Sequence, residues 1–494
     1  MSCTSLHTIH RTWLFIMTTV VLCLVIALFS GSLLFHQTIK KNATLVEFED
    51  YLRQFIPHLM EKSSIPGCSI SLVLNGEMVY SEAFGYADME SRRLLLPDTP
   101  MSVQSITKSV TAWGVLALVQ EGLLDLDVPV TEYLKTWDFP KTRYSVENVT
   151  AGTLLNHSAA MPLGDFNDVY APGEAMPSLR QTLTKQAGMT GEPGKFSYSN
   201  VGYHVLELLI EEITAKQFSA YMHEKVLAPL GMHASFFEIP DSMKGCVPTG
   251  YDLQGRPVPV YLYPEKSSGG LFATAEDIAR FAAASMKENP VLTAQQVRRL
   301  YKPEHTDIGV YSLVFDAYGL GHYLERLPNG MLSASHGGQG RGIMTHVQMV
   351  PETGDAIVIL TNSQRSWPFI AHVLTQWARW RDFGTVGMTH ILWAHYVMSG
   401  FIALLFSASM LLVLCAVLSP REEKRKGMGT AKALAALILI GILLWCKAQP
   451  YLLVNSVFPV LSKWLGWAVL CVSMSLLVSA LLPIFTDRKL CSYP

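Results

Sequence analysis

The sequence predicts an α+β fold, in which an antiparallel sheet is flanked by helices and accompanied by a helical subdomain. Strand patterns joined by tight turns stand near both ends of a central region, and amphipathic helix patterns lie between them. Hydrophobic segments outside this region predict one N-terminal and three C-terminal transmembrane helices. We therefore divide the chain into an N-terminal signal anchor at 1–36, a globular domain at 44–380 and a three-helix transmembrane region at 391–485.

Two hairpins are expected to bring strands from both ends of the domain into the sheet. Asn75-Gly76 supplies the positive φ angles that a two-residue hairpin turn requires, and apolar residues alternate with polar ones around it. Near the C-terminal end of the domain, the turn at 351–354 joins two further strand patterns. The expected strands cover residues 69–72, 77–80, 338–350 and 356–361.

Two long helices are expected between these hairpins. The first starts at about Ser102 and ends near Gly122, because its apolar residues recur at spacings of three and four. The second runs from Ser199 to about Lys225. Ser105 then lies in the first turn of the first helix, where unpaired backbone N–H groups stabilise negative charge. The expected core positions are Ile106, Val110, Trp113 and Ala117 in the first helix and Val205, Leu208 and Leu209 in the second.

Three short motifs carry the candidate chemistry. Ser105 and Lys108 are three residues apart, so on a helix their side chains project from the same face. A serine hydroxyl is too weak an acid to attack a carbonyl unaided, and Lys108 offers a base. This Ser-x-x-Lys is the only one in the chain. It is followed by the only Tyr-x-Asn, which runs from Tyr198 to Asn200, and then by the His-Gly-Gly-Gln run at 336–339.

These motifs, in this order, resemble those of the serine β-lactamase and penicillin-binding-protein superfamily, and of its class C β-lactamase and D-aminoacyl peptidase branch in particular. Segments at 154–157, 229–232 and 269–277 look like the framework of the same family. The resemblance covers about residues 44–380 and implies the β-lactamase and DD-peptidase fold, with a cleft between the sheet and the helical subdomain. It also implies a serine hydrolase that forms an acyl-enzyme and requires no metal or organic cofactor.

The resemblance assigns a role to each motif residue. Ser105 is the nucleophile, and the backbone N–H groups of Ser105 and Gln339 are the oxyanion donors. Lys108 and Tyr198 relay the proton of Ser105 to the leaving group, and which of them is the formal base stays open. Because a cationic lysine favours a phenolate, we expect Lys108 to lower the pKa of Tyr198 from about 10. Asn200 is expected to orient Lys108 and a substrate carbonyl.

The third motif departs from the family pattern. His336 stands where many relatives have lysine, and a histidine titrates near pH 6.5. We therefore expect His336 to be a weaker and pH-dependent partner for a substrate carboxylate, which disfavours penicillin. Gly337 and Gly338 are expected to let a substrate backbone lie along the strand. Arg341 and Thr345 follow the motif and are candidates for substrate contact.

The composition excludes other classes of function. A net charge of −2, without a basic stripe interleaved with aromatic residues, argues against nucleic-acid binding. Asp125 and Asp127 are interpreted as a surface turn rather than a metal site, and His157 as a framework histidine. Of the eight cysteines, only Cys68 and Cys246 fall in the domain at 44–380, where they either pair or remain buried free thiols.

The hydrophobic segments are long enough to cross a bilayer. Residues 13–35 carry no charge and would span a hydrocarbon core of about 30 Å. We favour an uncleaved anchor here over a cleavable signal peptide. The segment at 431–450 is shortened by Lys447 and Pro450, so an interfacial or re-entrant piece is its alternative. The three C-terminal segments lie at 391–418, 431–450 and 464–485.

Basic residues predict the orientation of these segments. The short loop at 419–430, together with Lys432, carries five basic residues, whereas the next loop offers only Lys447 and Lys463. Loops rich in lysine and arginine stay cytoplasmic. We therefore expect a multi-pass protein of the plasma or inner membrane, with the domain at 44–380 on the extracytoplasmic side.

The sequence thus predicts a membrane-anchored serine peptidase that cleaves amides of acyl-D-amino-acid peptides. The order of segments resembles membrane-bound peptidases that activate prodrugs in nonribosomal-peptide pathways. One alternative is a β-lactamase, a D-alanyl-D-alanine carboxypeptidase or an esterase of the cell wall, and another is a non-catalytic penicillin-binding-protein-like sensor. The expected partners are a small-molecule or peptide substrate and the lipid bilayer, and the oligomeric state stays open.

Overall fold

The computed structural model describes residues 38–165, 167–418, 426–449 and 452–490. The described chain forms two compact units, one of which spans Ile39–His390 and the other of which contains the described residues after His390. The anchor expected at 1–36 and most of the basic loop at 419–430 lie outside the described residues. Each unit is described by itself below.

The first unit is built on an eight-stranded antiparallel sheet with the strand order β3-β2-β1-β12-β11-β10-β9-β8. Both expected hairpins are present, and β1 pairs directly with β12, so strands from the two ends of the domain meet in the middle of the sheet. The strands are β1 Gly67–Leu74, β2 Glu77–Asp88, β3 Arg93–Leu94, β8 Ala317–Tyr318, β9 Tyr323–Arg326, β10 Leu332–Gly340, β11 Ile343–Val350 and β12 Asp355–Thr361.

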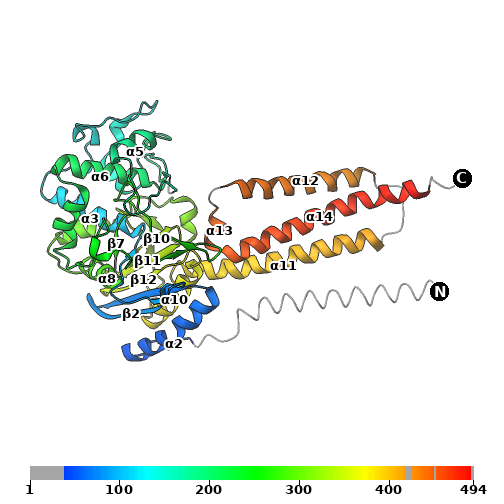
Figure 1. Ribbon diagram of the computed structural model, residues 1–494, viewed down its shortest axis with the longest axis horizontal. Coiled ribbons are helices and arrows are strands. Elements are labelled where there is room, and N and C mark those ends of the chain that lie inside the picture. The colour runs from blue at the N-terminus through cyan, green and yellow to red at the C-terminus, as the bar shows by residue number, and fades with distance from the viewer. Residues whose placement is uncertain (1–37, 166, 419–425, 450–451, 491–494) are drawn as a thin grey trace. The chain divides into compact units, whose positions relative to one another are not determined.

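Helices cover both faces of this sheet (Figure 1). Helices α2 (Leu45–Ser63) and α10 (Trp367–Trp380) pack together, with the rings of Phe48 and Trp380 stacked at 4.1 Å. Helices α3 (Ile106–Gln120) and α8 (Ala275–Ala284) contact the strands from the other face. Because both faces are covered, every residue of β11 and β12 is buried.

Helix α3 is the central helix of the unit and is apolar on nearly all sides. It packs against the sheet on one side and against α6 and α7 on the other. A helix that is apolar all round is typical of a buried position between two layers. The helical subdomain contains α4 Ala151–Leu155, α5 Leu179–Gln186, α6 Asn200–Thr214 and α7 Phe218–Met222.

Both expected helices are shorter than the apolar pattern predicts. The expected start near Ser102 is wrong, because Met101–Ser102 forms the short strand β4, which pairs with β7 (Phe272–Ala273). The expected end near Lys225 is also wrong, since α6 stops at Ala215, whose φ of 53° is left-handed. A separate short helix and a π-helical segment, His223–Leu227, follow.

The strand expected at 338–350 is in fact two strands. Gly342, with a φ of 79°, turns the chain between β10 and β11. Gly338 and Gln339 therefore belong to the end of β10 rather than to the start of the last hairpin. This turn places the third motif at the end of a strand, where its outer edge is open.

The second unit contains three long apolar helices. They are α11 (Thr389–Leu418), α12 (Lys426–Ala448) and α14 (Pro459–Leu490), with the short α13 (Leu453–Val457) before the last. Each is long and apolar enough to cross a membrane, over Thr389–Ala416, Gly429–Ala448 and Pro459–Leu481. The three C-terminal apolar helices expected from the sequence are therefore present.

Candidate active site

Ser105 sits at the N-cap of α3, at the end of a sharply turned segment. The residue before it, Gln104, has a φ of 51°, a conformation that L-residues rarely adopt. The turn leaves Ser105 half-buried, while Ile106 and the rest of the first helical turn are buried. An accessible hydroxyl at a helix N-terminus is well placed for attack on a carbonyl, since the helix dipole stabilises the negative charge that develops there.

Lys108 lies within reach of Ser105 and has two further oxygen partners. Its Nζ is 3.1 Å from Ser105 Oγ, 2.7 Å from Asn200 Oδ1 and 2.8 Å from the backbone oxygen of Ser268. The Asn200 and Ser268 oxygens can only accept hydrogen bonds. A neutral amine has two N–H groups and one lone pair, so these two oxygens take the N–H groups. The lone pair is then left to accept the proton of Ser105.

Burial favours the neutral forms of both Lys108 and Tyr198. Desolvation lowers the pKa of the fully buried Lys108 well below its ordinary value of 10.5. Desolvation raises the pKa of Tyr198 well above 10, nearby Tyr311 adds to this increase, and a hydrogen bond with Ser105 opposes it. The expected lowering of the Tyr198 pKa by Lys108 is therefore wrong, because desolvation is the largest effect on Tyr198 and also shifts Lys108 toward its neutral form. Lys108 is the better proton acceptor, and Tyr198 is a phenol that can pass a proton on.

Tyr198 completes a cluster around the nucleophile. Its side chain hydrogen-bonds with that of Ser105, and Lys108 Nζ lies 5.0 Å from the centre of its ring. His157 packs 4.3 Å from the same ring, and its Nδ1 accepts a hydrogen bond from the backbone N–H of Ser199 at 3.2 Å. His157 thus holds the Tyr-x-Asn segment in place, in the framework position expected for it.

His336 does not face the site as a titrating partner for a substrate. Its Nδ1 is 2.8 Å from the Gly337 carbonyl oxygen, which can only accept, so Nδ1 carries the proton. Its Nε2 then accepts a hydrogen bond from the Tyr318 hydroxyl at 3.3 Å. Burial lowers the pKa of His336 well below 6.5, and Lys108 contributes to the decrease. The expected pH-dependent contact to a carboxylate is therefore wrong, because this histidine is buried and neutral.

The glycines of the third motif make room for the protein's own chain. A methyl group at Gly338 would collide with the Val103 carbonyl oxygen and with Thr345 Oγ1. At Gly337 it would lie 2.6 Å from the ring of Trp367. The segment before Ser105 therefore packs directly on β10 beside Gln339. The sequence predicted that a substrate backbone would lie close to these glycines. The protein's own turn at 103–105, which we call the nucleophile turn, lies there instead.

The outer edge of β10 is open beside this turn. Pairing between β9 and β10 ends at Ser335, whereas pairing between β10 and β11 continues to Gly340. Residues 336–340 therefore have a strand neighbour on one side only within the described sheet. Such an edge can accept an extended peptide through main-chain hydrogen bonds.

Two other candidates from the sequence lie in different surroundings. Thr345 is fully buried, and its Oγ1 donates to the Val103 carbonyl oxygen at 2.8 Å, so its expected contact with substrate is wrong. Arg341 is exposed, and its backbone N–H donates to Tyr261 Oη at 2.8 Å. Gln339 Oε1 accepts a hydrogen bond from Trp367 Nε1 at 3.2 Å.

Sequence reasoning missed several neighbours of the site. Ser268 contributes a backbone oxygen. Every residue type has such an oxygen, so the sequence does not identify this contact, although the following Gly269-Gly270 was assigned to the family framework. Gln104 is held by Ser102 Oγ at 2.7 Å and by the Tyr263 hydroxyl at 3.1 Å. An aromatic cluster beside Tyr198 was also missed, and it contains Phe196, Tyr311, Phe315, Tyr318 and Tyr323.

The cysteines and acidic residues of the described chain form no other reactive centre. Cys68 is a buried free thiol whose pKa is raised by burial. Cys246 is also free but exposed, so the expectation that it is buried or paired with Cys68 is wrong. Among the described residues, no group of three or more His, Cys, Asp or Glu side chains could hold a metal ion.

A family model described as Beta-lactamase matches residues 52–374, which is more than half of the chain. The chain belongs to this family. It is therefore a member of the β-lactamase and penicillin-binding-protein-like serine hydrolase superfamily, as its sheet and helices also indicate. This membership implies a hydrolase.

Two relatives of this chain align with it over more than half of their length. Protein flp of Staphylococcus aureus (strain N315) is 24% identical over 470 residues, which cover 89% of each chain. The unguisins hydrolase ungD' of Aspergillus campestris is 24% identical over 334 residues, which cover 63% of this chain and 61% of that protein.

Two solved structures share the fold. The octameric penicillin-binding protein homologue from Pyrococcus abyssi matches with a TM-score of 0.57 and 27% identity, covering 66% of this chain and 77% of that one. A penicillin binding protein from Bacillus halodurans matches with a TM-score of 0.55 and 24% identity, covering 65% of this chain and 98% of that one.

Substitution of the three central side chains tests their proposed roles. We expect Ser105→Ala to abolish labelling by a fluorophosphonate and Lys108→Ala to slow it at least about a hundredfold, the usual scale for a proton-transfer group. Because Tyr198 passes a proton to the leaving group, we expect Tyr198→Phe to lower amide turnover by a similar factor. Tyr133→Phe is the matched control, since that hydroxyl only accepts a hydrogen bond from the backbone N–H of Asp125. A Tyr198→Phe protein that turns over an amide at a normal rate would refute the relay.

The pKa shift of Lys108 sets the pH dependence. Below its pKa the amine is an ammonium and cannot accept the Ser105 proton, so the labelling rate rises with pH and levels off above that pKa. Because burial lowers this pKa, we expect the midpoint of the rise well below 10.5. Because burial raises the pKa of Tyr198, no loss of rate is expected before about pH 10. A midpoint at or above 10.5 contradicts a neutral Lys108.

Proposed function

We propose that this protein is a membrane-anchored serine peptidase that forms an acyl-enzyme at Ser105 and cleaves amides of acyl-D-amino-acid peptides. The observation that carries the proposal is the buried Lys108 amine, whose Nζ lies within hydrogen-bond distance of Asn200 Oδ1, the Ser268 carbonyl oxygen and Ser105 Oγ. Family membership supports the hydrolase, and the apolar helices support the membrane.

The proposed reaction has two half-reactions. Ser105 Oγ attacks the amide carbonyl while Lys108 accepts its proton, and the resulting oxyanion is held by the backbone N–H groups of Ser105 and Gln339. The proton passes through the Tyr198 phenol to the amide nitrogen, the C–N bond breaks and the amine leaves. Water then attacks the ester carbonyl and gives a proton to Lys108. The ester bond to Ser105 Oγ breaks, the acid leaves, and Lys108 returns that proton to Ser105 Oγ.

The open edge of β10 supports an extended peptide as the substrate. Residues 336–340 have main-chain groups on an unpaired edge next to the nucleophile turn. The neutral, buried His336 gives no permanent cation for the carboxylate of a penicillin, so an uncharged acyl-peptide loses little. The similarity to an unguisins hydrolase also supports hydrolysis of a peptide.

The membrane unit supports a substrate that carries a lipid chain. The similarity to Protein flp covers 89% of both chains, so it extends beyond the Beta-lactamase domain into the region of the apolar helices. A hydrolase held at a bilayer meets an acylated substrate that partitions there, and each buried methylene adds about 0.8 kcal/mol to partitioning. The domain is proposed to lie on the extracytoplasmic side, in keeping with the basic loop at 419–430.

Substrate preference is the first test of this function. We expect purified protein in detergent to cleave a long-chain acyl-D-asparaginyl amide at least about tenfold faster than its L-epimer, and to hydrolyse benzylpenicillin poorly. The Ser105→Ala protein is the control for background hydrolysis. Efficient turnover of benzylpenicillin, or a preference for the L-epimer, would return the chain to the β-lactamase or esterase alternative.

Native Cys246 allows a direct test of the topology. This thiol is free and exposed in the hydrolase unit, so an impermeant maleimide should modify it in intact cells if that unit lies outside. Cys246→Ser is the matched control and should lose the label. A cysteine introduced at Gly427 in that background should react only after the membrane is permeabilised, because the loop is expected inside. The reverse pattern would refute the orientation.

A further inference from the structure

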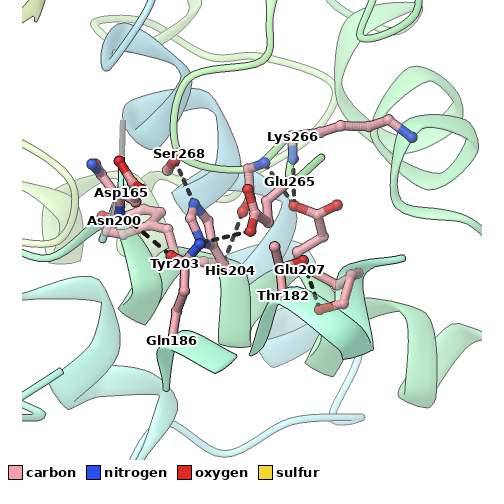
Figure 2. A network of polar contacts seen from close by, with 12 residues as sticks. Asp165, Thr182, Gln186, Asn200, Tyr203, His204, Glu207, Glu265, Lys266 and Ser268 are labelled. Carbon is pink, nitrogen blue, oxygen red and sulfur yellow. Dashed lines mark hydrogen bonds and ion pairs between the residues drawn. The ribbon is translucent and has the colours of Figure 1, made fainter. Parts of the chain in front are cut away.

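A polar stripe runs along α6 behind the catalytic lysine. Asn200, His204 and Glu207 follow one another at spacings of four and three, so they lie on one face of the helix. Asn200 contacts Lys108 directly. His204 and Glu207 instead contact the segment at 265–268, whose last residue supplies the backbone oxygen that Lys108 also contacts (Figure 2).

Glu207 fixes the backbone of this segment. Its side chain is 3% exposed, and its Oε2 accepts the backbone N–H groups of Lys266 at 2.7 Å and of Ser267 at 2.8 Å. The Ser267 carbonyl oxygen in turn accepts from Thr111 Oγ1 on α3 at 2.8 Å. The segment is therefore tied to both helices that carry the catalytic groups, α3 and α6, immediately before Ser268.

His204 holds the next residue of the segment. Its Nε2 lies 2.8 Å from Ser268 Oγ, and its Nδ1 lies 3.8 Å from Glu265 Oε1. His204 Nδ1 and Glu265 Oε1 are both buried, and neither makes a hydrogen bond in the described structure. Burial lowers the pKa of His204 to about 3, so the ring is neutral. Its contact with Ser268 Oγ is thus a hydrogen bond between neutral groups. This bond holds the side chain of Ser268, whose backbone oxygen contacts Lys108 Nζ.

We propose that Glu207 and His204 are positioning residues for Lys108, which they serve by fixing the Ser268 carbonyl oxygen. The inference rests on the proposed function, in which Lys108 is the base. With the Ser268 oxygen fixed, one N–H of the Lys108 amine donates a hydrogen bond to it, and the amine lone pair is then directed to Ser105. If the segment is loosened, the amine can rotate, and water can reach it.

The chemistry of Glu207 supports a role beyond packing. A buried carboxylate is costly, and burial raises the pKa of Glu207 to about 7, although its hydrogen bonds to the segment and the nearby Lys266 cation oppose the increase. An apolar side chain would fill the space without that cost, but it could not accept two consecutive backbone N–H groups. The groups that face Lys108 or its supporting segment are Tyr198, Tyr203, His157, His204, His336, Glu207 and Glu265.

The test follows the rate of fluorophosphonate labelling of Ser105 against pH, using the full chain in detergent. We expect Glu207→Ala to lower the maximal rate at least about tenfold, with the half-saturating probe concentration nearly unchanged. The midpoint of the rise with pH should move up by about one unit or more, because water admitted to Lys108 returns its pKa toward about 10.4. Glu207→Gln keeps an acceptor oxygen and should restore both values.

Two further variants make the result specific. Glu211→Gln is the matched control on the same helix, since Glu211 accepts the backbone N–H of Phe218 and does not contact the segment at 265–268. Ser268→Ala removes only the hydroxyl that His204 contacts. It should lower the rate about threefold or more and raise the midpoint, and His204→Phe should add nothing to it, because the two changes break one contact.

Several outcomes would overturn the inference. A folded Glu207→Ala protein with an unshifted midpoint shows that Glu207 is only structural, and a Glu207→Gln protein as slow as Glu207→Ala shows that the acceptor is not what matters. If Glu207→Ala does not fold, an unshifted midpoint in Ser268→Ala refutes the proposal instead. Absence of labelling in the unsubstituted protein refutes the acyl-enzyme at Ser105 and, with it, this inference. A preference for the L-epimer or for benzylpenicillin overturns the proposed substrate but leaves the positioning of Lys108 untouched.

Discussion

The burial of one lysine amine is the constraint on which the rest of the site depends. Lys108 is fully buried, so its charge is disfavoured and its few hydrogen-bonding groups need defined partners. Three separate elements supply them: the helix start with Ser105, helix α6 with Asn200, and the segment that ends in Ser268. The sheet, the central helix and the helical subdomain are packed so that these three elements converge on a single nitrogen.

The same burial disfavours permanent charges in the site. Lys108, Tyr198 and His336 are all shifted toward their neutral forms by desolvation. Such a site is suited to proton transfer among desolvated, neutral groups, rather than to binding an anionic substrate through a fixed cation. That property distinguishes it from a pocket built around a permanent cation, and it is the reason that we propose an uncharged amide rather than a penicillin as the substrate.

The sequence predicted the parts of this structure that depend on local pattern. The two hairpins, the three apolar C-terminal helices and the spacing that brings Ser105 next to Lys108 follow from periodicity and turn residues. The pattern failed where tertiary pairing decided the outcome: Met101–Ser102 forms a strand pair instead of a helical turn. It also failed for ionisation, because the pKa of Tyr198 depends on burial, which spacing along the chain does not reveal.

The central position of β1 beside β12 bears on how the protein is made. Cys68 pairs with Thr361, so the middle of the sheet joins segments from opposite ends of the hydrolase unit. Contacts between such distant parts of a chain form slowly, because a long loop must close before they stabilise anything. During synthesis, the N-terminal strands must therefore wait for the last one to emerge. A chain that stays unfolded for that long would suit export of the hydrolase unit to the extracytoplasmic side, as proposed, before the active site is assembled.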